Sequence, residues 1–444
     1  MSPGTKAALV DRAAAALESI GAVRSPAWTT WFVPGRLEVL GKHTDYAGGR
    51  SVICALERGF AFVAIPRGDG KVRVVDGADG SVACFPLDPN LEPGAGWANY
   101  PRTVARRVAR NFPDARRGAD IAFSSDLPPA AGMSSSSALI IGVFLVLADV
   151  NAIESGERYR HDIRSREDLA GYLATIENGQ GFRSLVGDAG VGTFGGSEDH
   201  TAILCAEPGR LAQYAFCPVR RERTVAPPRD HVFAIATSGV AAEKTGAARD
   251  AYNRAAAMAS RILDLWRSAT GRADVSLAAA IASGPDAPDR IRQIVGHSTD
   301  AGWPSDRLLD RFEQFFEESE RIIPATMARL AAGDAAAIGP LVDRSQRLAE
   351  RLLGNQIPET TALARSAREL GAVAASAFGA GFGGSVWALV PTATHPEFLN
   401  RWAAAYRDAF PAAAARAQFF VTCPGPAAIR LENLWMNTPR AGIF

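Results

Sequence analysis

The sequence is poor in the residues that build disulfide frameworks and metal clusters. Five cysteines are scattered through 444 residues, an odd number without CxxC spacing. The six histidines show neither an HExxH pattern nor another metal-binding spacing. This usage predicts free thiols in a reducing, cytoplasmic compartment.

Long apolar runs and an excess of one charge are also absent. No stretch of 18 apolar residues occurs, so no membrane-spanning helix is predicted, and the first residues lack the apolar core of a signal peptide. The net charge of +1 argues against a broad nucleic-acid surface but permits a small anionic ligand. The chain, with 47% hydrophobic and 21% charged residues, is expected to form two or three globular domains with neither nucleic-acid nor membrane partners. The oligomeric state stays open.

A serine-rich segment leads directly into a long apolar one. Residues Leu127–Val150 read LPPAAGMSSSSALIIGVFLVLADV. Serines favour the start of a helix, and Ala138–Val150 contains one charged residue, so we predict a buried helix there. The N-terminus of such a helix presents free backbone N–H groups and the positive end of its dipole, which together suit a phosphate. On this segment alone, an ordinary capped helix is the alternative.

The N-terminal part predicts mainly strands separated by turns. Residues 28–66 alternate β-like runs with glycine-containing breaks at Pro34-Gly35 and Gly48-Gly49. The polar loop Lys42–Tyr46 (KHTDY) is either a functional loop or a merely solvated one. A helix is predicted over Trp97–Phe112, and its four arginines favour a basic, solvent-exposed face.

Acidic residues follow at two places. A helix predicted over residues 165–178 carries Glu177 at its C-terminal end, where a carboxylate opposes the helix dipole and is either exposed or compensated by a cation. The segment Gly195–His200 (GGSEDH) combines paired glycines, which permit close backbone approach, with two carboxylates. Glu198 and Asp199 are therefore either surface charges or parts of a site.

A charge run with a Pro-Pro pair at Arg220–Asp230 predicts a domain boundary. Beyond it, alanine, leucine and arginine periodicity predicts several helices. These are Val240–Ser268, Ser305–Ala332, Asp334–Leu353 and Thr360–Leu370. Short strands then flank a glycine-dense segment within Ser376–Val386 (SAFGAGFGGSV), which indicates unusual dihedral angles or close approach to a ligand.

Three of these stretches, in this order, resemble the motifs of the GHMP kinase superfamily and, within it, the galactokinase branch. Pro34–Gly49 (PGRLEVLGKHTDYAGG) is similar to the galactokinase signature GRxNLIGEHTDYNGG. Leu127–Ala138 is similar to the family's phosphate loop, and Ser376–Val386 to its third, glycine-rich motif. The resemblance covers nearly the whole chain. It implies an α+β, two-domain fold with mixed sheets and helices, with domains at residues 1–225 and 226–444 and the active site between them.

The resemblance also implies an activity and assigns roles to residues. The activity would be transfer of the γ-phosphoryl group of ATP to the anomeric hydroxyl of an aldose, with galactose the first expected substrate. Asp199 would accept the hydroxyl proton, Arg36 would hold that aspartate charged, and Mg²⁺ would be bound by Ser136 and Glu177. Predicted sugar contacts come from Glu38, Lys42, His43, Asp45, Gly196 and Tyr252. Predicted nucleotide contacts come from Trp97, Tyr100, Ala131, Gly132, Ser134, Ser135, Ser136 and Ser137.

The chain departs from the family pattern at informative positions. Lys42 replaces the glutamate of GEHTDY, and Glu38 replaces the asparagine of GRxN. Lys42 either selects a sugar that bears a carboxylate or pairs with Glu38, Glu57 or Glu177 and leaves a neutral sugar acceptable. If Lys42 excludes galactose, Lys42→Glu should gain activity toward it. Ala130 stands where glycine is usual and favours a negative φ. The alternatives are a kinase of another sugar, such as a uronate or arabinose, and a non-catalytic sensor of sugar and ATP.

Overall fold

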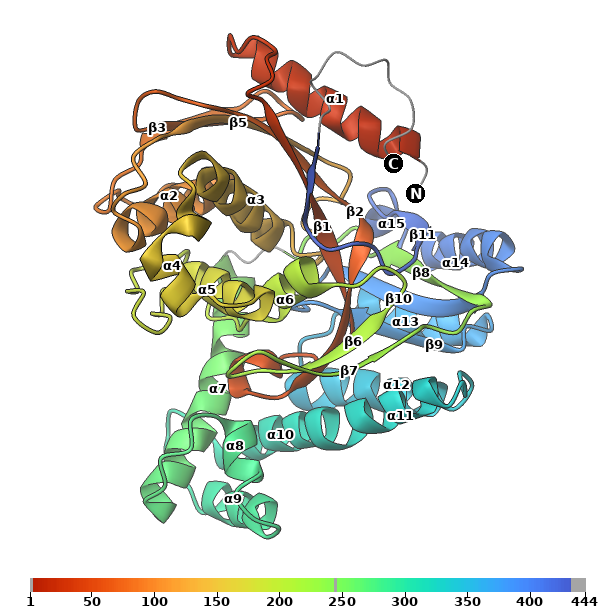
Figure 1. Cartoon of the computed structure of the whole chain (residues 1–444). Coiled ribbons are helices and arrows are strands. Elements are labelled where there is room, and N and C mark those ends of the chain that lie inside the picture. The colour runs from red at the N-terminus through yellow and green to blue at the C-terminus, as the bar shows by residue number, and fades with distance from the viewer. Residues whose placement is uncertain (1–2, 243–245, 433–444) are drawn as a thin grey trace.

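Two β-sheets organise the protein, whose computed structural model describes residues 3–242 and 246–432 (Figure 1). Among these residues the larger sheet has eight strands in the order β12-β1-β2-β5-β3-β4, with β6 paired to β2 and β7 paired to β6. The smaller sheet has the order β11-β8-β10-β9. The strands are β1 (Thr29–Leu40), β2 (Arg50–Pro66), β3 (Lys71–Asp76), β4 (Val82–Pro86), β5 (Ala119–Ser125), β6 (Leu211–Ala215), β7 (Arg220–Val225), β8 (His231–Thr237), β9 (Ala374–Phe378), β10 (Ser385–Pro391), β11 (Phe419–Thr422) and β12 (Ile429–Leu431).

Helices surround both sheets. In the N-terminal part they are α1 (Pro3–Ser19), α2 (Asn99–Asn111), α3 (Ser135–Val150), α4 (Glu157–Asp162), α5 (Arg166–Asn178) and α6 (Glu198–Cys205). Beyond β8 they are α7 (Gly246–Thr270), α8 (Leu277–Ile281), α9 (Ala287–Gly296), α10 (Ser305–Phe316), α11 (Ile323–Ala331), α12 (Ile338–Leu348), α13 (Pro358–Glu369), α14 (His395–Ala409) and α15 (Pro411–Ala414). Within the described residues, no helix is long and apolar enough to cross a bilayer.

The predicted buried helix after the serines is confirmed as α3. Its residues from Ser137 to Ala148 are all buried, and the apolar side chains among them belong to the largest hydrophobic cluster of the described residues. The helix packs so closely on the large sheet that a Cβ at Gly142 would lie 2.1 Å from the ring of Phe62 on β2. Ser134 precedes the helix with a φ of 63°, and its side chain makes no capping bond. The rigid sheet and helix therefore fix where the N-terminus of α3 points.

The predicted break at Pro34-Gly35 is wrong, because β1 runs through it as one strand. The pairing of β1 with β2 shifts register between Pro34 and Arg36, as in a β-bulge. Proline, which lacks a backbone N–H, is tolerated at a bulge. The Arg36 N–H donates instead to the Met133 carbonyl at 3.2 Å, so the bulge connects β1 to the loop that precedes α3.

The helices predicted after residue 240 are found with shifted bounds. Helix α7 begins at Gly246, and residues 243–245 of the predicted helix lie outside the described residues. The predicted helix Ser305–Ala332 is α10 and α11 joined by a π-helical turn, Glu317–Ile322. Helices α8 and α9 were not predicted; they pack with α7 and α10 around a separate hydrophobic cluster. The boundary between residues 225 and 226 stays a prediction, and strand β12 from the C-terminal part pairs with β1, near α1 in Figure 1.

The expected basic, solvent-exposed face of α2 is wrong for two of its four arginines. Arg106 and Arg107 are 5% and 0% exposed and donate to Asp188 at 2.7 and 3.0 Å. Arg107 also donates to the Thr175 hydroxyl on α5. Asp188 lies in the loop between α5 and α6, so these pairs fix that loop against α2. The sequence pattern of the helix could not reveal this partner, because Asp188 lies 81 residues after Arg107.

Replacing Asp188 with alanine should destabilise the protein. Removing one member of a buried ion pair leaves uncompensated charge, here two guanidinium groups, at a cost of about 3–5 kcal/mol. Chemical unfolding of Asp188→Ala should show a markedly lower midpoint. Asp408→Ala, at an exposed position on α14, is the matched control and should change stability by no more than about 0.5 kcal/mol. Equal midpoints for the two variants would contradict the structural role of Asp188.

Candidate active site

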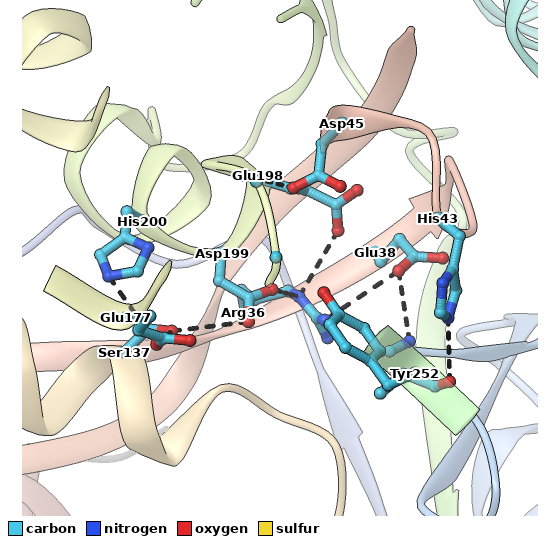
Figure 2. Close-up of a pocket in the computed structure, with 14 residues that line it drawn as sticks. Arg36, Glu38, His43, Asp45, Ser137, Glu177, Glu198, Asp199, His200 and Tyr252 are labelled. Carbon is cyan, nitrogen blue, oxygen red and sulfur yellow. Dashed lines mark hydrogen bonds and ion pairs between the residues drawn. The ribbon is translucent and has the colours of Figure 1, made fainter. Parts of the chain in front are cut away.

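A cavity brings together residues from β1, α3, α5, α6, α7 and the glycine-rich loop before β10 (Figure 2). Both sides of the predicted domain boundary contribute to it. It is lined by Arg36, Glu38, His43, Asp45, Ser137, Glu177, Gly195, Gly196, Glu198, Asp199, His200, Tyr252, Gly379 and Ala380.

An ion pair between Arg36 and Asp199 lies at the centre of this cavity. The Arg36 Nε donates to Asp199 Oδ1 at 2.7 Å, and Nη1 donates to the Gly132 carbonyl at 2.7 Å. Glu198 Oε1 lies 3.7 Å from Nε, and Glu38 Oε2 lies 4.0 Å from Nη2. Burial opposes the charged form of Arg36, but the three carboxylates outweigh that effect and raise its pKa. Asp199 also lies in the first turn of α6, where the helix dipole favours an anion.

Glu177 is buried at the C-terminal end of α5, so the exposed alternative for it is wrong. The Ser137 hydroxyl donates to Glu177 Oε1 at 2.7 Å and lies 3.5 Å from Asp199 Oδ2. Ser136, the serine predicted to bind Mg²⁺ with Glu177, does not line the cavity. Successive helical residues point about 100° apart, so the structure brings Ser137, the next residue, to Glu177. His200 Nε2 lies 3.9 Å from the same carboxylate oxygen.

The loop before α3 uses left-handed backbone conformations at three positions. Ala130, Gly132 and Ser134 have φ values of 49°, 72° and 63°. The expectation of a negative φ at Ala130 is therefore wrong: the loop keeps this conformation without glycine, which is a strained arrangement. The Ala131 carbonyl accepts a bond from the Ser385 hydroxyl at 2.7 Å, so β10 holds the loop in place.

The remaining nucleotide candidates lie outside the cavity. Ser135 is half-buried at the start of α3. Trp97 and Tyr100 are half-buried beside the main hydrophobic cluster. The rings of Trp97 and Phe123 meet edge to face, with their centroids 5.5 Å apart. The nucleotide-binding roles of these residues stay predictions.

His43 connects the first and third motifs. Its Nε2 lies 3.0 Å from the Ala380 carbonyl, and its Nδ1 lies 2.9 Å from the Tyr46 hydroxyl. A carbonyl only accepts, so Nε2 carries a proton. Arg311, fully buried on α10, donates to the His43 carbonyl and to the Tyr46 hydroxyl. Both ring nitrogens of His43 thus have protein partners, and its predicted bond to a sugar hydroxyl stays a prediction.

Two glycines let the backbone of the segment Gly195–His200 lie close to Asp45 and Tyr252 in the lining of the cavity. A Cβ at Gly196 would lie 2.5 Å from Asp45 Oδ2, and a Cβ at Gly195 would lie 2.7 Å from the Tyr252 hydroxyl. Asp45 Oδ2 accepts the Glu198 N–H at 3.1 Å. Burial, followed by repulsion from Asp45, raises the pKa of Tyr252 well above 10.0, so Tyr252 is a neutral phenol.

Lys42 does not line the cavity, and its predicted contact with the substrate stays a prediction. It is 1% exposed, and its Nζ donates to Ser376 Oγ at 2.7 Å and to Ser345 Oγ at 3.4 Å. The side chain therefore extends between β9 and α12. Its positive charge still acts on Glu38 and lowers the pKa of that carboxyl, although burial raises it more.

Five lining residues were not assigned a role from the sequence: Gly195, Glu198, His200, Gly379 and Ala380. Glu198 is 5% exposed and accepts a hydrogen bond from the Ser51 hydroxyl. Burial and repulsion from Glu38 raise the pKa of Glu198 well above 4.5, although Arg36 opposes them. The sequence did contain an indication for Glu198, because it directly precedes Asp199 in the segment GGSEDH. The glycine density of the third motif similarly marked the place of Gly379 and Ala380.

Comparison with known families defines the class of protein. A model of the GHMP kinases N terminal domain matches residues 99–196, and one of the GHMP kinases C terminal matches residues 326–408. The chain belongs to the GHMP kinase superfamily. The galactokinase galactose-binding signature matches residues 18–66, which identifies the chain as a galactokinase-like member of that superfamily.

Similar proteins agree with this assignment. A galactokinase of Actinobacillus pleuropneumoniae serotype 5b is 37% identical over 118 residues, 26% of this chain. The chain matches about 30% of the length of that relative. A galactokinase of Roseiflexus sp. is 27% identical over 382 residues, which cover 85% of this chain and 87% of the relative.

The solved Lactococcus lactis galactokinase complexed with galactose shares the fold. Its TM-score is 0.77 at 22% identity, over 96% of this chain and 99% of that one. The predicted α+β, two-domain fold is thereby confirmed.

Lys42→Glu should not gain activity toward galactose. The new carboxylate would be buried near Glu38 and near Glu318, which already accepts bonds from Gly41 and Ser345. Uncompensated buried charge of this kind costs about 3–5 kcal/mol, so the thermal unfolding midpoint should fall. Lys42→Met, which removes the charge without reversing it, is the comparison and should destabilise less. Increased galactose turnover by folded Lys42→Glu would contradict this placement.

Glu198→Gln should stabilise the protein in a pH-dependent way. A carboxyl whose pKa is raised on folding makes the protein less stable as the pH rises above its ordinary value of 4.5. Glutamine lacks this ionisation and still accepts the Ser51 bond. The gain in melting temperature over wild type should therefore be larger at pH 8 than at pH 5. Glu369→Gln, at an exposed position on α13, should show no such trend, and a pH-independent gain for Glu198→Gln would contradict the raised pKa.

Proposed function

We propose that this protein is an ATP-dependent sugar kinase that phosphorylates the anomeric hydroxyl of an aldose, with galactose the first candidate. Two sets of observations support this: the galactokinase signature over residues 18–66, and the likeness to a galactokinase complexed with galactose. The geometric observation that carries the proposal is the position of Asp199. It is paired with Arg36 through one oxygen and faces Ser137, at the N-terminus of α3, with the other.

In the proposed reaction the carboxylate of Asp199 accepts the proton of the anomeric hydroxyl. The sugar oxygen then forms a bond to the γ-phosphorus while the bond from that phosphorus to the β–γ bridging oxygen breaks, and ADP leaves. Arg36 keeps Asp199 ionised until the proton arrives and offsets negative charge on the attacking oxygen.

The N-terminus of α3 is the proposed phosphate site, because its free N–H groups and dipole favour anions. The oxygen donors of Glu177 and a neighbouring serine fit Mg²⁺, which binds through one or two carboxylates together with phosphate oxygens. We propose Glu177 as the protein carboxylate, with Ser136 or Ser137 as the hydroxyl. The metal would neutralise charge on the phosphates and would lie beside Glu177, whose carboxylate opposes the dipole at the C-terminus of α5.

The choice among sugars rests on the residues that line the cavity. Lys42, which supported a sugar with a carboxylate, lies outside the cavity. We therefore favour a neutral sugar over a uronate. Asp45, Glu38 and Tyr252 remain as proposed sugar contacts.

Asp199→Asn should abolish most of the activity while leaving ATP binding nearly intact. Loss of a general base lowers the turnover number by about 10²–10⁴-fold, and asparagine keeps the size of the side chain. The assay is formation of ADP and a sugar 1-phosphate from Mg-ATP and galactose, with the product identified by phosphorus NMR. ATP affinity is measured separately by calorimetry.

Asp408→Asn is the control and should retain wild-type turnover. Wild-type turnover by Asp199→Asn would contradict the proposed mechanism. A wild-type protein that binds ATP and sugar but forms no product would contradict the kinase proposal and favour a sensor.

A further inference from the structure

The acceptor cavity, the one that Arg36 and Asp199 line, has more carboxyl groups than lysine or arginine side chains in its described lining. Its five carboxylates are those of Glu38, Asp45, Glu177, Glu198 and Asp199. Among the described residues that line it, Arg36 is the one lysine or arginine. Buried carboxylates are costly unless they are paired.

Glu38 has an acceptor oxygen that the described part of the chain does not satisfy. Its side chain is buried, with the residue 3% exposed, and Oε2 accepts the Gly379 N–H at 3.2 Å. Oε1 is buried and has no hydrogen-bond partner among the described residues. The ammonium of Lys42 donates to Ser376 and Ser345, and its effect on Glu38 is electrostatic. In Figure 2 the carboxylate lies between Arg36 and His43 within the cavity.

Glu198 adds a second carboxylate to the same region. Glu198 Oε1 lies 3.7 Å from Arg36 Nε, whereas Asp199 Oδ1 lies 2.7 Å from the same nitrogen. Arg36 therefore interacts more strongly with Asp199 than with Glu198. Repulsion between Glu38 and Glu198 helps to raise the pKa of Glu198. An acceptor molecule that fills this region therefore meets the carboxyl groups of Glu38 and Glu198 beside one guanidinium, which Asp199 also shares.

Two kinds of donor can satisfy Glu38 Oε1, and they differ in charge. A sugar hydroxyl supplies a hydrogen bond but no positive charge to compensate the Glu38 carboxylate. An ammonium supplies both the hydrogen bond and a positive charge, and hydrogen bonds between ionised groups are about twice as strong as neutral ones. Protonation of the carboxyl would instead convert an acceptor into a donor.

We infer that the acceptor site is selective for hexoses of the galactose class that carry a protonated amino group, which Glu38 binds with support from Glu198. This inference rests on the proposed kinase function. The ammonium takes no part in the transfer, in which the anomeric proton still passes to Asp199 and ADP leaves.

The first experiment compares kcat/KM of the wild-type protein with Mg-ATP and four sugars. These are galactose, 2-amino-2-deoxygalactose, 6-amino-6-deoxygalactose and N-acetylgalactosamine. At least one amino sugar should exceed galactose by about tenfold or more, the gain expected from a charge-assisted hydrogen bond. N-acetylgalactosamine, which keeps the nitrogen at C2 but not its charge, should show no such gain.

Variants then test whether Glu38 causes the preference for an amino sugar over galactose. Glu38→Gln should lower kcat/KM for the preferred amino sugar at least about tenfold more than for galactose. Glu198→Gln should reduce the preference in the same direction, and it serves as the second variant if Glu38→Gln unfolds. The exposed control Glu369→Gln should leave the preference unchanged. Thermal unfolding of each variant verifies that it is folded.

Each other outcome has a distinct meaning. If galactose equals or exceeds both amino sugars, or if Glu38→Gln lowers all sugars equally, the amino-sugar inference is overturned while the kinase function stands. If none of the four sugars is converted although ATP binds, the proposed function fails and the inference fails with it.

Discussion

The buried ion pair between Arg36 and Asp199 is the interaction on which the site depends. Its two members are 163 residues apart and come from a bulge in β1 and the first turn of α6. A buried guanidinium needs charge compensation and acceptors for its N–H groups. Asp199 supplies the first, and the Gly132 carbonyl supplies an acceptor from the loop before α3. One side chain of the first motif thus holds the loop before α3 and the segment Gly195–His200 in a single arrangement.

Further polar contacts extend this arrangement to the third motif. His43 reaches the Ala380 carbonyl, and Ser385 reaches the Ala131 carbonyl. Both contacts join the N-terminal part of the chain to the glycine-rich loop and β10. Because α3 is wedged against the large sheet at Gly142, the serines at its start are presented from a rigid support. The cavity is therefore a property of how distant segments pack, and no single motif contains it.

Charge placement within a shared fold gives this protein its individual character. Lys42 is buried and does not line the cavity, whereas Glu38, also buried, does line it. The galactokinase signature has a glutamate at the position of Lys42, in the loop after β1, and an asparagine at the position of Glu38. In this protein the carboxylate therefore stands on β1 instead of in the following loop. A fold supports many substrates, and the side chains of the site select among them.

The sequence by itself determined the elements whose signals are local. An apolar run after four serines predicted α3, the helix predicted over residues 165–178 is α5 with Glu177 at its end, and three ordered motifs indicated the family. Tertiary structure alone decided which way Lys42 points, that Ser137 and not Ser136 meets Glu177, and that Arg106 and Arg107 are buried against Asp188. The physical reason is that helix and strand signals arise from neighbouring residues, whereas the burial and pairing of a charge depend on groups that are distant in sequence. Those partners meet only when the chain is folded.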